Sequence, residues 1–430
     1  MQASMTEPSV RHGVIAIGAV HQDYVSRHEN WGKNHDPSME AFAFRQYTKA
    51  ISHLHQLMST RTQQLDITLI ACILFISFDC LLGNHASAII HLKAGLKILE
   101  DIKFQNAYGA TFAQTTSAHE WEKEFSPLLL ALGVQAASFV NPKLREDRTA
   151  LWNALKRAGI PTHPTTFTSL DEARHALDTL AAEIMTDRTS TTDRIMEEKI
   201  PNPNGPEGQR HIAALQTWEE ALETSIPEIV KRDTLLKKTQ LGASMLKIHG
   251  TFLSIVLRMP EPADAKFDKL LELCQTNLRT KTGCSCGPSH LNFSIDLGLI
   301  GPLFFTALRA PQKSLQRRAY DMLLQAPGRE GMWDTEDAIR VAGEAVGITS
   351  QQEPSAALTL PTACPQHEAR TWNDISEKLQ TRLSWPYGQR EEPAIPLSFI
   401  HGVPLTRSIP SRSGLPFTKE EYLAADQSGK

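Results

Sequence analysis

Six cysteines, the side chains best suited to bind zinc, occur at positions 72, 80, 274, 284, 286 and 364. A binuclear zinc cluster also uses six, but it needs Cys-x-x-Cys pairs within one short basic segment, because its thiolates bridge two metals. The sequence contains no such pair. Cys72 and Cys80 are eight residues apart, or about 12 Å along an expected helix, too far for a disulfide or a shared metal. We therefore interpret them as small core residues.

A second group consists of Cys284-Ser-Cys286 with His290 and Cys274 nearby, and it is the one local set that could hold a soft metal. Its spacing is not that of a zinc knuckle. A turn with ordinary thiols between Gly283 and Gly287 is the favoured interpretation, and a metal or redox site is the alternative.

The 16 histidines form no recognisable catalytic pattern. His119-Glu120 lacks the second histidine of a zinc-protease helix, since Lys123 occupies that position. His53 and His55 point to different sides of one expected helix. The Gly-rich phosphate loop, the dinucleotide fingerprint and the serine nucleophile elbow are all missing from the sequence. We therefore predict no catalytic residue, no metal site and no cofactor, and expect a protein that is not an enzyme.

Charge argues against tight nucleic-acid binding, because 44 Lys and Arg face 48 Asp and Glu, a formal net charge of −4 over 430 residues. Basic residues cluster only modestly, at Lys231-Arg232 with Lys237-Lys238 and at Arg317-Arg318. The first cluster could act as a weak nuclear-import signal, while solvated helix faces are the simpler interpretation. We expect no sequence-specific DNA binding by this chain alone.

The location of the protein is predicted from its apolar segments and its thiols. The first residues show no basic region followed by an apolar stretch, so no secretory signal is visible. The most apolar run, Ile67 to Phe78, is shorter than the roughly 20 residues of a membrane span and predicts a buried core helix. Sparse cysteines are typical of a reduced compartment. We expect an intracellular protein without membrane contact.

Helical periodicity dominates the elements that must position these residues. Apolar side chains recur at steps of three and four from Met39 to Met58 and from Ala88 to Leu99, with an almost wholly apolar segment from Gln63 to Leu82 between them. Gly83 and Asn84 suit a helix end and the next N-cap. Further helices are predicted at Trp121–Val140, Arg148–Ala158, Leu170–Met185, Gln209–Thr224, Lys231–Met259, Ala263–Thr280, Ile295–Ala310, Lys313–Gln325 and Thr335–Val346.

The predicted fold is all-α, an array of antiparallel helix pairs. Prolines and glycines between positions 201 and 208 mark a loop. We place an N-terminal helical lobe at 1–200, a C-terminal lobe at 209–350, and a peripheral segment with a Pro-rich, irregular and partly mobile tail at 351–430.

Two sequence blocks resemble the regulatory region of fungal zinc-cluster transcription factors. The first comprises His12–His21, Gln46–Ile51, Leu69–Phe75, Leu82-Gly-Asn84 and Ala88–Leu96. The second comprises Phe293–Phe305, Gln316–Ala319 and Pro327–Trp333. The order of the blocks also matches, and in outline the resemblance covers residues 10–350. Within it, Asn84, Arg317-Arg318, Glu330 and Trp333 are expected to serve as caps, ion pairs and helix contacts.

The resemblance implies an all-helical regulatory domain in a nuclear or nucleocytoplasmic regulator of transcription, of a kind often associated with secondary-metabolite pathways. Members of that family carry an N-terminal zinc cluster, whereas here the domain begins almost at Met1. We therefore expect action through protein partners, such as the transcription machinery or a full-length relative; a zinc cluster encoded upstream is the alternative explanation. A small-molecule-sensing domain with an unidentified effector and an enzyme of a biosynthetic pathway stay open as other hypotheses.

Overall fold

The computed structural model describes residues 2–29, 37–59, 65–108, 112–139, 164–190, 203–232, 236–259, 264–282, 293–326 and 328–347. Nearly all of these residues are helical, so the predicted all-α class is confirmed. The expected helix Arg148–Ala158 and the segment 351–430 lie outside the described residues.

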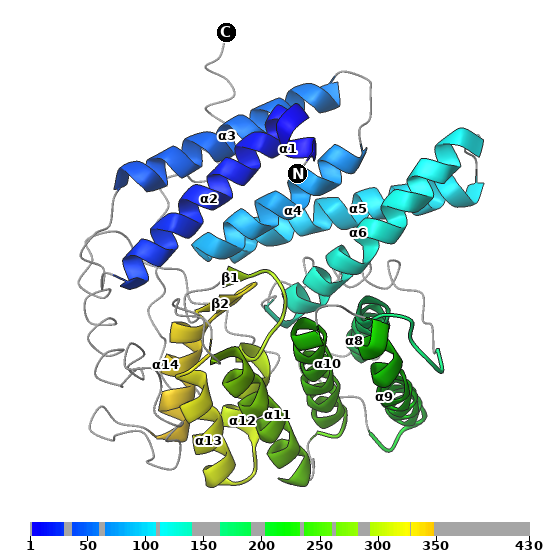
Figure 1. Ribbon diagram of the computed structural model, residues 1–430, viewed down its shortest axis with the longest axis vertical. Coiled ribbons are helices and arrows are strands. Elements are labelled where there is room, and N and C mark those ends of the chain that lie inside the picture. The colour runs from blue at the N-terminus through cyan, green and yellow to red at the C-terminus, as the bar shows by residue number, and fades with distance from the viewer. Residues whose placement is uncertain are drawn as a thin grey trace.

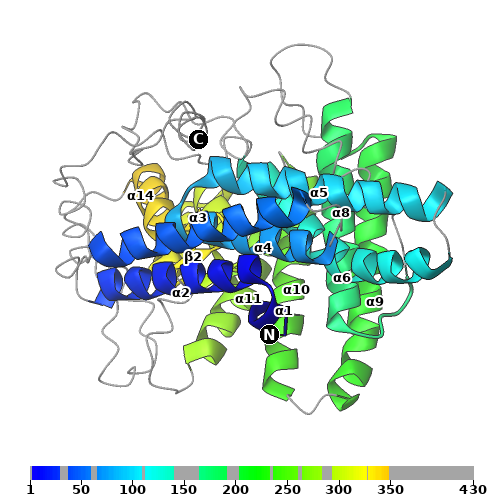
Figure 2. The same cartoon turned by 90° about the horizontal axis from the view of Figure 1, so that it is seen from above.

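The N-terminal helices form the upper part of the molecule in Figure 1 and face the viewer in Figure 2. They are α1 (Gln2–Thr6), α2 (Pro8–Glu29), α3 (Pro37–Ser59), α4 (Leu65–Leu82), α5 (His85–Tyr108) and α6 (Phe112–Phe139). The expected hairpin of α4 and α5 is present. The main partner of α3, however, is α2, a helix that apolar spacing alone had not predicted. Seen from above, α2 and α3 lie side by side (Figure 2).

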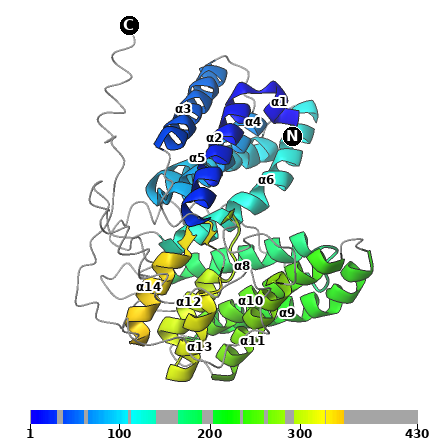
Figure 3. The same ribbon diagram turned by 60° about the vertical axis from the view of Figure 1, so that its left-hand side comes forward.

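The C-terminal helices lie below this layer (Figure 3). They are α8 (Leu170–Ser190), α9 (Pro206–Arg232), α10 (Leu236–Leu257), α11 (Asp264–Thr282), α12 (Ile300–Arg309), α13 (Lys313–Leu323) and α14 (Thr335–Val346). A small sheet lies between the layers in Figure 1 and contains β1 (Phe293–Ser294), β2 (Arg329–Glu330) and β3 (Trp333–Asp334). In it, β1 pairs parallel to β2, and β2 pairs antiparallel to β3.

Several predicted helix boundaries were wrong: α6 begins at Phe112 and not at Trp121, α8 ends at Ser190 and not at Met185, and α9 ends at Arg232 and not at Thr224. Two further errors have a common cause. The helix expected from Ile295 starts only at Ile300, because Phe293–Ser294 instead pairs with Arg329–Glu330 in the sheet. The helix expected from Lys231 to Met259 is divided, since α9 continues to Arg232 and α10 starts at Leu236. Both errors arise where apolar spacing continues across a change in backbone direction that only tertiary contacts reveal.

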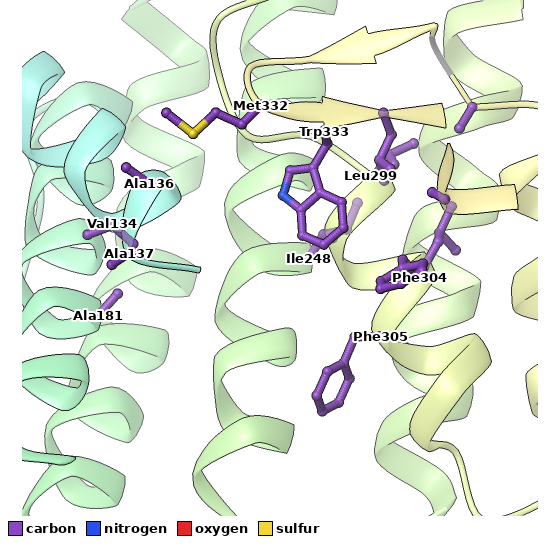
Figure 4. Packing of buried hydrophobic residues seen from close by; sticks show 14 of the residues in the cluster. Val134, Ala136, Ala137, Ala181, Ile248, Leu299, Phe304, Phe305, Met332 and Trp333 are labelled. Atoms are coloured by element: carbon purple, nitrogen blue, oxygen red, sulfur yellow. The ribbon is translucent and has the colours of Figure 1, made fainter. Parts of the chain in front are cut away.

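One hydrophobic cluster joins the two layers. It contains residues of α4, α5 and α6 together with residues of α10 to α14, among them Leu92 of α5 and Ile248 of α10, both fully buried. Figure 4 shows the indole of Trp333 extending from β3 into this cluster beside Phe304, and the two ring centroids are 5.4 Å apart. The division into lobes at 200 and 209 stays a prediction, and this cluster draws residues from both sides of it.

The central apolar helix, α4, extends beyond the run from which it was predicted. With 18 residues it is, in the part of the chain that is described, the one helix long and apolar enough to cross a membrane. Of its residues, 61% are buried inside the protein, and Leu69 and Ile76 are fully enclosed in the main cluster. This packing is the arrangement expected of a core helix.

Candidate functional site

The end of α4 is the first part of a buried polar connection between the two layers. Gly83 has φ +74°, a left-handed conformation that glycine adopts without steric cost, and it closes the helix as predicted. The last carbonyl groups of a helix have no partner within the helix. Here Nη1 of Arg329 donates to the carbonyl oxygens of Cys80 at 2.8 Å and Leu81 at 2.9 Å.

Arg329 is neutralised by Asp334, to which its Nη2 donates. Burial by itself lowers the pKa of Arg329, but the neighbouring carboxylate outweighs this effect and raises it. Asp334 also starts α14, because its Oδ1 accepts the backbone N–H groups of Glu336 at 3.0 Å and Asp337 at 3.1 Å. One carboxylate thus both pairs with the buried guanidinium and caps a helix.

Glu330 fixes the start of α12 from the next position of β2. It is 2% exposed, and its Oε2 accepts the N–H of Ile300 at 2.8 Å. The position next to this carboxylate must be glycine, since a Cβ at Gly298 would overlap Glu330. Gly331, with φ +55°, lies equally close to Gln135 of α6. We call residues 328–334 with these contacts the junction, and it ties α4 and α6 to α12 and α14.

A second polar group lies inside the N-terminal layer, around Asp79 of α4. Its carboxylate is 3.4 Å from the hydroxyl of Tyr47 and 3.6 Å from Nε2 of His91, and those two groups are 2.9 Å apart. Burial raises the pKa of Asp79 to about 7, although hydrogen bonds from Ser87, Tyr47 and Asn84 lower it. Burial also lowers the pKa of His91 to about 4. Between these pH values both groups are therefore uncharged in the folded protein.

A third group connects α8 and α10 to the segment that leads into α12. Arg174 is 3.4 Å from Asp178 on its own helix and 3.3 Å from Asp296 in that segment. His249 lies 3.0 Å from the carbonyl oxygen of Gly298, and burial lowers its pKa to about 4. The neutral form of His249 can make this hydrogen bond within the fold. The polar groups around Arg329, Asp79 and Arg174 each connect helices to one another or to the segment before α12.

Four of the scaffold residues singled out in the sequence have the roles expected of them. Glu330 caps α12 and Trp333 packs in the core, as described above. Arg317 pairs with Asp321 at 3.1 Å, and Arg318 reaches Asp268 on α11 at 3.4 Å. Asn84 precedes α5, but its side-chain nitrogen lies 3.5 Å from Asp79, so it also supports the buried carboxylate.

The described cysteines are core thiols, as predicted for Cys72 and Cys80. Cys72, Cys80 and Cys274 are buried, and burial raises the pKa of Cys72 to about 11 and that of Cys80 to about 12. Such thiols stay protonated and are poor nucleophiles or metal ligands. The group of Cys284, Cys286 and His290 lies outside the described residues.

Of the histidines discussed in the sequence, His53 and His55 lie on α3 and His119 lies on α6. His53 is partly buried and stacks on His12 at 5.4 Å, whereas His55 is exposed, so the two do point to different sides of α3. The side chains of His119 and Glu120 are not among those described. Among the residues that the structure does describe, no three His, Cys, Asp or Glu side chains are grouped as a metal site requires.

Arg329 is the residue that the sequence did not single out, although it lies inside the second block. Its acceptors are backbone carbonyl groups 248 and 249 positions earlier, which leave no trace in local spacing. The available signal was an arginine directly after Pro327-Gly328, a few residues before an aspartate that begins a helix.

Comparison with known proteins finds two matches, both to proteins of transcription. Residues 1–126 match the family model of the fungal specific transcription factor domain. The resemblance to this family is thereby confirmed for the N-terminal layer. The chain is also similar to the transcription regulator lscL of Purpureocillium lilacinum, with 22% identity over 267 residues. That alignment covers 60% of this chain and 62% of the relative's length. No solved structure matches. Both matches support a role in transcription regulation.

Proposed function

We propose that this chain is the helical regulatory part of a transcription regulator, and that it acts in the nucleus through protein partners without reading DNA bases itself. The observation that carries the proposal is the match of residues 1–126 to the fungal specific transcription factor domain. The partners are components of the transcription machinery or a full-length zinc-cluster relative. Family resemblance makes genes of a secondary-metabolite pathway the expected targets.

The distribution of basic side chains supports the absence of direct DNA reading. Phosphate binding needs clustered cations whose charge is available to the ligand. Arg317 and Arg318 instead pair with Asp321 and Asp268 within the fold. Lys231, at the exposed end of α9, pairs with Glu228 at 2.5 Å. The net charge of −4 adds repulsion between the chain and a polyanion.

The described side chains also support a regulator without enzymatic activity. Four of the groups with strongly shifted pKa values, Asp79, His91, His249 and Arg329, form hydrogen bonds or ion pairs that hold helices together. The buried thiols are held in their protonated form. These groups serve the scaffold, and the work of the protein is then done at its surface by contact with other molecules.

A tethering experiment tests the proposal. The full chain is fused to a heterologous DNA-binding domain and directed to a reporter promoter in a fungal host. We expect reporter transcription to change, and the change to disappear for Leu92→Asp, which places a charge in the core and disrupts the fold. Equal amounts of the two fusions are verified by immunoblotting. An unchanged reporter in the presence of the folded fusion would reject action through partners.

A gel-shift titration tests the second half of the proposal. The purified chain is mixed with a promoter fragment at about 150 mM salt, with and without a scrambled competitor, since surface charge is well screened there. We expect only weak retention that falls as salt rises from about 50 to 200 mM, as for phosphate contacts alone. Tight binding that the scrambled DNA fails to displace would show a DNA-reading surface.

A further inference from the structure

Two cationic side chains meet at one buried hydroxyl between α10 and α11. Ser254 of α10 is 3% exposed. Nη1 of Arg258 donates to its Oγ at 2.6 Å and to its carbonyl oxygen at 3.1 Å. Nζ of Lys266, in the first turn of α11, donates to the same Oγ. The uncharged hydroxyl oxygen of Ser254 therefore accepts hydrogen bonds from two cations. Because the hydroxyl carries no charge, it does not neutralise either of them.

The charge at this place is unbalanced. Burial lowers the pKa of Lys266, and the nearby Arg258 and Lys269 lower it further, while Glu219 acts in the opposite direction. Arg258 and Lys266 thus place two positive charges at one hydroxyl. Three other partly buried arginines, Arg174, Arg317 and Arg329, each have a carboxylate at ion-pair distance. Across the described residues, neither Arg258 nor Lys266 has one.

The start of α11 adds a second reason for an anion. The first N–H groups of a helix have no acceptor within the helix, and the positive end of the helix dipole disfavours a cation in the first turn. Lys266 occupies that turn. The acidic residue there, Asp264, accepts a hydrogen bond at 2.7 Å from Gln312 near α13. An anion beside Lys266 would relieve both the repulsion and the unfavourable dipole.

We propose that Ser254, Arg258 and Lys266 form a binding site for a phosphate group, either free phosphate or the phosphate of a small monoester. The two positive charges of Arg258 and Lys266 match a dianion, and the donor set combines a guanidinium, an ammonium and a hydroxyl. This site goes beyond the proposed regulatory function and does not depend on it, because the test measures binding alone. A bound phosphate would stabilise the packing of α10 against α11.

The test is a titration of the full chain with inorganic phosphate, at constant ionic strength adjusted with sodium chloride. We expect saturable binding heat and a rising melting temperature, as for any ligand that binds only the folded state. Lys266→Met should weaken phosphate affinity about tenfold or more, because one charge-assisted hydrogen bond is lost. The matched control is Lys247→Met on α10, where the lysine is paired with Glu223, and it should leave the affinity unchanged.

Two further measurements separate binding from a merely structural role. Without phosphate, Lys266→Met should melt no lower than the parent, because it removes repulsion; a structural hydrogen bond would give a lower melting temperature. Arg258→Gln, at the residue that follows α10, gives a second test. Glycerol 3-phosphate distinguishes the sources, since tighter binding than phosphate indicates an ester and equal binding indicates the free ion. No saturable response to either probe, or an equal response in Lys266→Met, would overturn the site.

Discussion

Arg329→Met is the substitution that tests the junction most directly. Methionine retains much of the aliphatic length of arginine, so little packing is lost. The change removes the donors to the carbonyl groups of Cys80 and Leu81, and it leaves Asp334 as a buried carboxylate without its cation. Asp334 keeps the two backbone N–H groups of α14, which limits the loss.

The expected cost follows from this geometry. Removing one partner of a buried ion pair costs about 3–5 kcal/mol, because the remaining charge is desolvated without compensation. The side chains of Arg329 and Asp334 are 13% and 12% exposed, so this range applies to them. A domain has roughly 5–15 kcal/mol of total stability, so the variant should lose a large fraction of it.

Urea denaturation followed by far-ultraviolet circular dichroism provides the assay. The control is Arg340→Met, since Arg340 pairs with Asp337 at 3.3 Å within α14 and both side chains are more exposed than those of the Arg329 pair, so the change should cost about 0–1 kcal/mol. Asp334→Asn keeps the cap but removes the charge, and combined with Arg329→Met it should cost less than the sum of the two single changes. If Arg329→Met cost no more than Arg340→Met, the junction would be a contact without energetic importance.

The remaining predictions concern the core and the buried acid. Leu92→Asp should lower the unfolding free energy by several kcal/mol or abolish soluble expression, whereas Ile90→Asp, at a position 65% exposed on the same helix, should melt like the parent. Asp79 binds protons more tightly in the folded state and His91 more tightly in the unfolded state, so between about pH 4 and 6.5 their contributions oppose each other. Asp79→Asn removes the first contribution, so the stability of that variant should rise with pH across this window more steeply than that of the parent; equal slopes in urea titrations would contradict the assignment.

Local chemistry explains which elements were predictable. The boundaries of α14 were predicted as the structure has them, because Asp334 caps its first turn and Gly347, with φ +78°, ends it. Gly83 likewise ended α4 as expected. In both helices the signal lies within a few residues of the boundary, so a single sequence contains it.

Long-range pairing explains what was missed. Nothing within the segment from Ile295 to Leu299 indicates that it lies outside the helix. The cause is the pairing of β1 with β2, together with the close approach of the Glu330 carboxylate to Gly298. The polar groups of the candidate site had the same problem. Tyr47, Asp79 and His91 meet from three helices, and their spacing in sequence carries no common period.

The junction also explains why two sequence blocks so far apart occur together. The match to the family model ends at residue 126, yet the end of α4 within it finds its hydrogen-bond donor at Arg329. Leu92 in the first block shares one hydrophobic cluster with Trp333 in the second. A helix end buried without donors is costly, and so is an apolar face without a partner. The boundary of the matched region is therefore a boundary of sequence similarity and not of the folded unit. A substitution at the junction should lower the stability of both helical layers.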